Sequence, residues 1–238
     1  MHEYRVRRRA RDNWIAGIAL VVVAAGATFA QLAFFNGGPG TPVATETSTP
    51  EPTETTPAGQ NSGDVPDSGL AEGRTWTGTL TINDVPLGIQ LDGAAAPQAV
   101  SSFISLSQKD FYTGVSCHRL TNGGFFVLQC GDPEGDGSGG PGYSYGPVEN
   151  APADNVYPAG TLAMARQGDN AYSMGSQFFI VYEDTTIPSD SAGGYTVLGT
   201  VTSGLDELTA QVTDQGIADG SADGAPAIPV SITGVVVE

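Results

Sequence analysis

The chain has 238 residues, with 26 acidic side chains against nine lysines and arginines, and a formal net charge of −17. Five of the nine basic residues precede residue 14, so the rest of the chain carries four basic residues against 24 acidic ones. Such an excess of negative charge argues against charge-driven binding of this part to nucleic acid or to an anionic lipid surface.

Residues 1–13 are basic, and residues 14–35 form an uncharged apolar run of 22 residues. A helix of this length crosses a hydrocarbon core of ~30 Å. Arginines before the span predict a single-pass cell-membrane protein with a cytoplasmic N-terminus and an extracytoplasmic domain. The alternative is a cleaved signal peptide and a secreted protein, with residues 28–30 (TFA) as the cleavage site, although the apolar core of a signal peptide is usually only ~7–15 residues.

Residues 36–73 are rich in Pro, Thr, Ser, Glu and Gly and carry few bulky apolar side chains. Such a composition cannot bury enough apolar surface to offset the entropy of ordering, so it predicts a disordered linker. Residues 74–238 then have the size of one domain with a single hydrophobic core.

Within this domain, apolar and polar residues alternate over 76–82 and again over 85–91, which predicts a β-hairpin with one buried face. Helical spacing predicts a helix over 97–109, opened by a proline, and another over 205–212. Residues 230–237 close the chain as a strand. Many short strands with only two helices favour a closed antiparallel barrel.

Two segments carry motifs in a recognisable order, residues 118–132 (HRLTNGGFFVLQCGD) and 160–180 (GTLAMARQGDNAYSMGSQFFI). Together they resemble the signature of the cyclophilins, the peptidyl-prolyl cis/trans isomerases, and with the N-terminus they resemble a membrane-anchored bacterial member. The resemblance implies a mainly β fold, namely an eight-stranded closed barrel capped by two α-helices, here preceded by a transmembrane helix and a linker.

The resemblance also implies the chemistry. Rotation about an X-Pro amide faces a barrier of about 18–20 kcal/mol, and twisting leaves a lone pair on the prolyl nitrogen that can accept a hydrogen bond. Arg119 matches the catalytic arginine of the family, and Phe126 and Gln129 complete the expected catalytic set. Neither a metal nor a cofactor is expected to take part.

The remaining expected contacts bind the substrate, which is a proline-containing peptide or an unfolded secreted protein. An apolar pocket would hold the proline ring, and glutamines and exposed backbone would hold the flanking peptide. These predicted substrate-binding residues are Val127, Ala165, Arg166, Gln177, Phe179 and Tyr195.

The chain departs from the family pattern at several positions. Two residues are inserted before Phe126, Arg166 stands where the family commonly has Asn, and Tyr195 stands where many members have His. Residues 185–192 (TTIPSDSA) replace a Trp-Leu pair. Because that tryptophan contributes to cyclosporin binding in the family, the resemblance gives no prediction of sensitivity to the drug.

The two cysteines, Cys117 and Cys130, flank the predicted hairpin that carries Arg119 and Gln129. An even number of cysteines in an exported domain favours a disulfide, and strand ends facing each other across a hairpin lie within reach of one. The alternative is a pair of buried free thiols that pack as small apolar residues.

Three further alternatives remain from the sequence. Residues 132–143 begin like a calcium-binding loop but end in Tyr143 rather than Glu, so no metal site is expected. His118 is expected to be structural rather than a general base. The whole domain could also be a non-catalytic peptide-binding or chaperone module, or a structural protein of the cell envelope.

Overall fold

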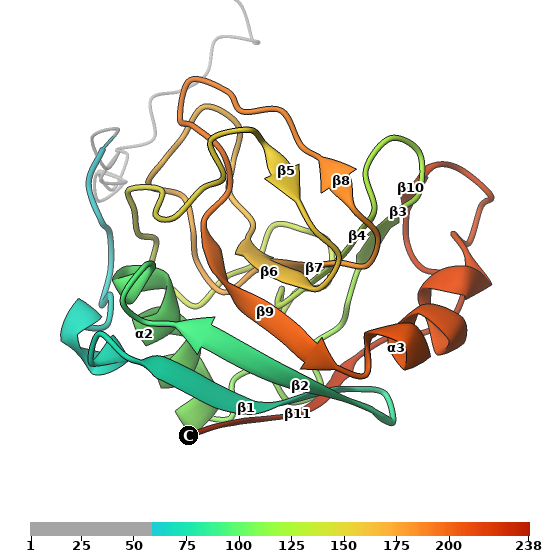
Figure 1. Ribbon diagram of the computed structural model, residues 1–238, viewed down its shortest axis with the longest axis horizontal. Coiled ribbons are helices and arrows are strands. Elements are labelled where there is room, and N and C mark those ends of the chain that lie inside the picture. The colour runs from blue at the N-terminus through green and yellow to red at the C-terminus, as the bar shows by residue number, and fades with distance from the viewer. Residues whose placement is uncertain (1–58) are drawn as a thin grey trace, which may run out of the picture. The chain divides into compact units, whose positions relative to one another are not determined.

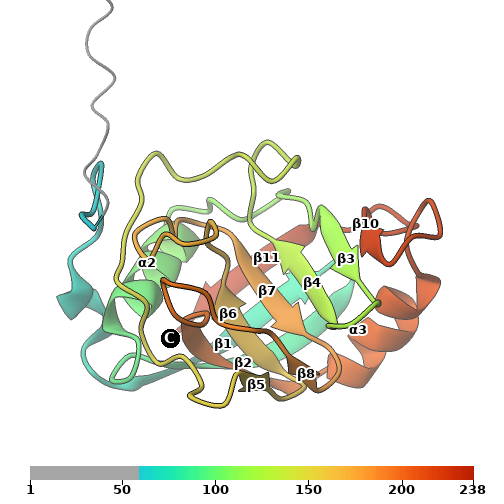
Figure 2. The same ribbon diagram turned by 90° about the horizontal axis from the view of Figure 1, so that it is seen from above.

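The computed structural model describes residues 59–238 (Figures 1 and 2). The predicted basic N-terminus, the predicted membrane span and linker residues 36–58 lie outside this range. Among the residues that the structure does describe, no helix has both the length and the apolar character to cross a membrane.

A nine-stranded antiparallel sheet dominates the fold, in the order β10-β3-β4-β7-β6-β9-β2-β1-β11, and a separate pair joins β5 to β8. The strands are β1 (Thr75–Ile82), β2 (Val85–Asp92), β3 (Arg119–Thr121), β4 (Val127–Cys130), β5 (Val156–Tyr157), β6 (Thr161–Met164), β7 (Phe178–Val181), β8 (Thr185–Thr186), β9 (Val197–Ser203), β10 (Asp223–Gly224) and β11 (Ile232–Val237).

Two α-helices lie at opposite ends of the sheet, α2 (Pro97–Gln108) and α3 (Leu205–Gln211), as Figures 1 and 2 show. The predicted bounds of both helices differ from these by one residue at the C-terminal end. Pro97 occupies the first turn of α2, where its missing N–H costs no hydrogen bond. The apolar residues at helical spacing, from Val100 to Leu106, are buried against the sheet.

The β1–β2 hairpin confirms the alternation read from the sequence. Val85, Leu87, Ile89 and Leu91 are at most 2% exposed, while the residues between them are partly or fully exposed. Side chains that alternate across a strand place one face of the hairpin in the core. Asn83 adopts a left-handed conformation at the turn, with φ of +49°, which asparagine tolerates better than most residues.

The predicted closed eight-stranded barrel needs correction, because the strand ladder has nine members and ends at β10 and β11. The segment before β3 connects to the start of β11 by an isolated bridge from Ser116 to Ser231 and by backbone hydrogen bonds between residues 114–117 and 230–232. Pro226 and Pro229 lie in the segment between β10 and β11, and a proline cannot donate to a ladder. The result is a curled sheet whose edge strands, β10 and β11, do not pair with each other across the seam.

The predicted linker also ends earlier than residue 73. Residues 68–71 form a 3₁₀ turn, η1 (Ser68–Ala71), in which Ala71 is fully buried. The Ala71 N–H donates to Ser101 Oγ on α2 at 2.9 Å, and the Trp76 indole N–H donates to the Ala71 carbonyl at 2.8 Å. Composition alone missed this docking because the apolar contacts come from a few scattered residues, Val65, Leu70 and Ala71, that show no period.

Candidate active site

The β3–β4 hairpin brings the predicted catalytic residues together. Arg119 opens β3 and pairs with Gln129 on β4, so both side chains lie on the same face of the sheet. The Arg119 Nη1 group donates to Gln129 Oε1 at 3.1 Å. The predicted neighbourhood of Arg119 and Gln129 is therefore present.

A chain of amide hydrogen bonds extends from Gln129 across the site. Gln129 Nε2 donates to Gln177 Oε1 at 2.9 Å. Gln177 Nε2 in turn donates to the carbonyls of Gly137 and Gly139, at 3.0 and 2.9 Å. Gln177 thus holds the glycine-rich loop against the strands, in addition to any contact it makes with a ligand.

An apolar pocket of about 180 Å³ adjoins the Arg119 guanidinium. Val127 and Phe179 form buried walls, with 3% and 4% exposure, and the Tyr195 ring packs edge-on against Phe179 at 5.5 Å between centroids. This set has the apolar walls and single polar rim that suit a small ring. The lining residues are Arg119, Phe125, Val127, Gln129, Ala165, Arg166, Phe179, Ile187 and Tyr195.

Phe126, which we predicted to be in the site, does not line this pocket. Its ring packs against Tyr182 at 5.8 Å, and Phe125 occupies the pocket instead, 5.6 Å from the Arg119 guanidinium. The alternation of side chains along an extended chain explains the difference. Phe125 lies two and four positions before Val127 and Gln129, so the three side chains point to the same face. Counting back by twos from Gln129 would have identified Phe125 from the sequence.

Arg166 lines both cavities of the site, and its guanidinium lies over the Tyr195 ring, 4.7 Å from the ring centroid. Its side chain is 0% exposed, and all five of its N–H groups have acceptors. Two go to the Asp190 carboxylate, both at 2.8 Å, and the others go to the carbonyls of Gln167, Gly193 and Gly194. The guanidinium thus fixes the loop before β9, while the expected contact of the Arg166 backbone with the peptide stays a prediction.

That loop supplies a pocket residue that the sequence comparison missed. Ile187 lies in the segment that replaces the Trp-Leu pair of the family pattern, and its side chain, 9% exposed, closes one side of the pocket. Tyr195 follows in the same loop and donates its backbone N–H to the Tyr157 hydroxyl at 2.8 Å. An apolar residue inside a polar stretch was the available signal for Ile187.

A second cavity of about 250 Å³ adjoins the first and is more polar. Its walls come from the glycine-rich loop 137–141, from Gln177 and from Ser173. Gln129, Ala165 and Arg166 line both cavities, so they mark the line along which a bound chain would pass. The Ala165 N–H already donates to the Gln177 carbonyl, so the group Ala165 can offer a ligand is its carbonyl oxygen.

Asp223, which the sequence analysis did not single out, contacts Arg119 directly. Its two carboxylate oxygens accept from Arg119 Nε and Nη2, at 2.7 and 2.6 Å. The hydrogen bond from Arg119 lowers the pKa of Asp223, and the same bond raises the pKa of Arg119. Both groups are therefore charged at neutral pH.

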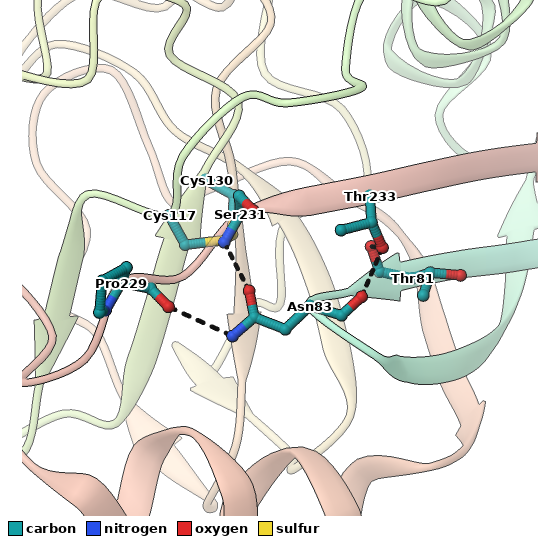
Figure 3. Close-up of a disulfide and its surroundings, with 7 residues drawn as sticks. All are labelled: Thr81, Asn83, Cys117, Cys130, Pro229, Ser231 and Thr233. Carbon is teal, nitrogen blue, oxygen red and sulfur yellow. Dashed lines mark hydrogen bonds between the residues drawn. A yellow bond between two sulfur atoms is a disulfide. The ribbon is translucent and has the colours of Figure 1, made fainter.

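The predicted disulfide between Cys117 and Cys130 is present immediately behind the site (Figure 3). Both cysteines are nearly fully buried. Beside them, Asn83 ties the β1–β2 turn to the start of β11, because its side-chain amide donates to the Pro229 carbonyl and accepts from the Ser231 N–H. The disulfide thus links the two segments that carry Arg119 and Gln129. The hydrogen bonds of Asn83 hold the neighbouring start of β11 in place.

Two residues next to the site, Asp132 and His118, are fully or partly buried. Asp132 is fully buried and accepts hydrogen bonds from the backbone N–H groups of Glu134, Asp136 and Gly137, which folds the glycine-rich loop. His118 is half-buried, and this burial lowers its pKa, so the imidazole is neutral at pH 7. A neutral, half-buried imidazole fits the structural role expected for His118.

The curled sheet, the two helices and an arginine beside an apolar pocket define the class of protein. The family model described as "Cyclophilin type peptidyl-prolyl cis-trans isomerase/CLD" matches residues 78–237. The chain therefore belongs to the cyclophilin-type peptidyl-prolyl cis-trans isomerase family, as the motifs predicted.

Similar proteins include a "Probable peptidyl-prolyl cis-trans isomerase B" of Mycobacterium tuberculosis, 42% identical over 172 residues. The match covers 67% of this chain, and the chain spans about half of that relative, or 54% of its length. The "Peptidyl-prolyl cis-trans isomerase B" of Bacillus subtilis is 43% identical over 113 residues, which are 47% of this chain and 73% of the relative.

Among solved structures, the chain is similar to a Cryptosporidium parvum cyclophilin type peptidyl-prolyl cis-trans isomerase. The TM-score is 0.57 at 24% identity, over 69% of this chain and 98% of that one. A second crystal structure of the same parasite protein, in the presence of the dipeptide Ala-Pro, gives a TM-score of 0.56 at 23% identity, over 68% and 98% of the two chains. At these identities the likeness supports the fold alone.

Proposed function

We propose that this chain catalyses cis/trans isomerisation of X-Pro bonds in proteins. The observation that carries the proposal is the Arg119 guanidinium at the rim of an apolar pocket that also contains Gln129. The pocket accepts the proline ring between Val127 and Phe179, and the guanidinium then faces the amide that must twist. Relatives named as isomerases support the same activity.

The reaction requires stabilisation of the twisted amide relative to the planar one. As the C–N bond turns, resonance is lost and the prolyl nitrogen becomes a hydrogen-bond acceptor. Three of the five Arg119 N–H groups are used by Asp223 and Gln129, and the remaining two can donate to that nitrogen. Because these donors are most useful when the amide is twisted, they lower the barrier more than they strengthen binding.

The substrate class follows from the two adjoining cavities. The apolar one takes a proline, and the polar one takes the residues that precede it, against Gln177 and the glycine-rich loop. An extended peptide of ordinary composition satisfies both. Unfolded segments of other proteins are therefore the proposed substrates.

The test is an exchange measurement on a short X-Pro peptide with the full chain, by NMR or by a protease-coupled assay. Faster cis/trans exchange, unchanged by a chelator, supports the isomerase. Binding of the peptide without faster exchange would support the alternative function, a non-catalytic peptide-binding or chaperone module. Arg119 favours the enzyme, since a binding module has no need of a donor aimed at the prolyl nitrogen.

We also propose that the domain works outside the cytoplasm, anchored by residues 14–35. The apolar run and the arginines before it support an anchor, and the Cys117–Cys130 disulfide suits an oxidising compartment. Fractionation of cells followed by external protease treatment would test this. Recovery of the protein in the membrane fraction with a protease-accessible domain supports the anchor, whereas recovery in the medium supports a cleaved signal peptide.

A further inference from the structure

The Arg119 guanidinium is held from the side that faces away from Gln129. Asp223 binds it through two parallel hydrogen bonds, to Nε and Nη2, while Nη1 donates to Gln129. A planar guanidinium with a carboxylate on one edge and an amide on another has little freedom to rotate. The contacts thus fix both the position and the plane of the group.

The chain brings Asp223 to this place by adding a short strand to the edge of the sheet. In β10, Asp223 pairs with Thr121 and Gly224 pairs with Leu120, as the position of β10 beside β3 in Figure 2 shows. Asp223 and Arg119 are then diagonal neighbours on one face, a spacing that a long side chain can bridge.

A glycine in the β3–β4 turn permits this approach. A Cβ atom added at Gly123 would lie far inside contact distance of the Ala222 side chain, so only glycine lets the two segments meet. The Asn122 N–H donates to the Ala222 carbonyl at 3.0 Å, which continues the pairing beyond β10. The two residues inserted before Phe126 thus belong to a turn that receives the β10 segment.

The ion pair contributes little to the stability of the fold. The side chains of Arg119 and Asp223 are 37% and 51% exposed, and ion pairs in such settings are typically worth about 0–1 kcal/mol. Asp223 also does not line the pocket, so it does not touch a proline bound there. The contact therefore matters for the geometry of Arg119 rather than for folding or for direct binding.

We propose that Asp223 is a positioning residue of the isomerase site, which holds the Arg119 guanidinium in place before the amide begins to twist. This inference rests on the proposed function of Arg119. It makes Asp223 one end of a hydrogen-bonded row that runs through Arg119, Gln129 and Gln177 to the glycine-rich loop. A donor that is already oriented needs no reorganisation during the reaction.

The test compares Asp223→Asn with Asp219→Asn in the full chain. Asn keeps the size of the side chain but cannot accept two hydrogen bonds with both side-chain termini. Asp219 lies in the same segment, and its carboxylate accepts from the Ser221 N–H, so its change to Asn matches the loss of charge without touching Arg119.

For Asp223→Asn we expect kcat to fall about tenfold, the scale on which outer partners of a functional group act. KM should change less than about twofold, because the contact orients a group that acts in the transition state. The melting temperature should stay the same, and Asp219→Asn should leave all three quantities unchanged. Asp223→Glu, which keeps the carboxylate, should recover part of the loss.

Two further measurements separate this inference from the proposed function. In the Arg119→Ala background, Asp223→Asn should have no additional effect on kcat, and the NMR signal of the Arg119 Nε–H should exchange with water faster in Asp223→Asn than in the wild type. If Arg119→Ala abolishes turnover while Asp223→Asn leaves kcat and the Nε–H signal unchanged, the inference is wrong and the proposed function stands. If Arg119→Ala keeps normal turnover, the proposed function itself fails. A higher kcat in Asp223→Asn would overturn the inference by showing that the carboxylate restrains the arginine unproductively.

Discussion

Phe125 and Phe126 are neighbours in the chain, yet their side chains have different surroundings. Phe125 lines the apolar pocket, whereas Phe126 packs on Tyr182. For Phe125→Ala we expect kcat/KM to fall about tenfold, because losing one half-buried aromatic contact with the substrate costs on the order of 1.4 kcal/mol.

The matched variant is Phe126→Ala, which should lower the melting temperature but leave kcat/KM of the folded protein near the wild-type value. Steady-state kinetics with one X-Pro peptide and thermal unfolding of both variants measure the difference. Loss of activity in Phe126→Ala with normal activity in Phe125→Ala would show that the family motif, rather than strand parity, identifies the pocket residue.

Arg166 lies at the site, and its side chain holds the loop before β9. All five N–H groups of its buried side chain have acceptors, so Arg166→Met removes five hydrogen bonds that hold the loop. The Asp190 carboxylate keeps its backbone donors, the N–H groups of Asp169 and Ala192. We expect the free energy of unfolding to fall, because the loop loses the guanidinium hydrogen bonds while the partly exposed Asp190 carboxylate can turn to water. Urea denaturation measures it, and a loss below the error of the fit would contradict the assigned role.

The Arg166–Asp190 ion pair gives the loop before β9 a dependence on pH. The hydrogen bonds from Arg166 lower the pKa of Asp190 below its usual value of 3.8. A carboxyl group with a lowered pKa stabilises the fold above its unfolded-state pKa, and this contribution is lost as the pH falls through the folded-state value. The loop should therefore stay fixed at neutral pH and loosen only in strong acid.

Among the elements, the β3–β4 hairpin depends most on a covalent link. The Cys117–Cys130 disulfide closes a loop with a sequence separation of 13 residues, for which the chain-entropy model gives about 3 kcal/mol. Reduced protein, or the Cys117→Ala/Cys130→Ala variant, should unfold at a correspondingly lower urea concentration. Equal midpoints for the oxidised and reduced forms would show that the bridge does not stabilise the fold.

The elements that the sequence predicted well are those with a strong local period. The β1–β2 hairpin and α2 each show a complete pattern of buried positions, so their bounds were predictable to within one residue. β10 was not predictable, because it has two residues, no apolar period and only an edge partner. The role proposed for β10 depends on the contact between Asp223 and Arg119, which lie 104 positions apart. No local sequence pattern predicts such a contact.

At the scale of the whole molecule, the sequence predicted the family and the cluster around Arg119. The structure corrected two predictions, the closed eight-stranded barrel and the end of the linker. The seam between β10 and β11 and the docking of η1 depend on long-range contacts of Ser116 and Ala71, which carry no motif. The site shows the same division. Motifs located Arg119, Gln129 and Phe179. The structure located Phe125, Ile187 and Asp223, which the motifs did not single out.

Because the chain is strongly acidic, the position of each of its few basic side chains helps to assign that residue's role. Of the four basic residues after residue 35, Arg74 stacks on Trp76, Arg166 is buried against Asp190, and Arg119 alone among the three arginines lies at the pocket rim with N–H groups to offer. The central claim is that these N–H groups stabilise the twisted amide. Arg74→Ala provides the control for removing an arginine elsewhere in the domain.

The most direct test is therefore the kinetics of Arg119→Ala in the full chain, with kcat and ground-state peptide affinity measured separately. The account predicts that kcat falls ~10²–10³-fold, by analogy with loss of an oxyanion-hole donor, while peptide affinity and melting temperature change little. Arg119→Lys should recover little activity because an ammonium lacks the planar fork. Near-normal turnover with weakened peptide binding in Arg119→Ala would contradict the account and make Arg119 a docking residue.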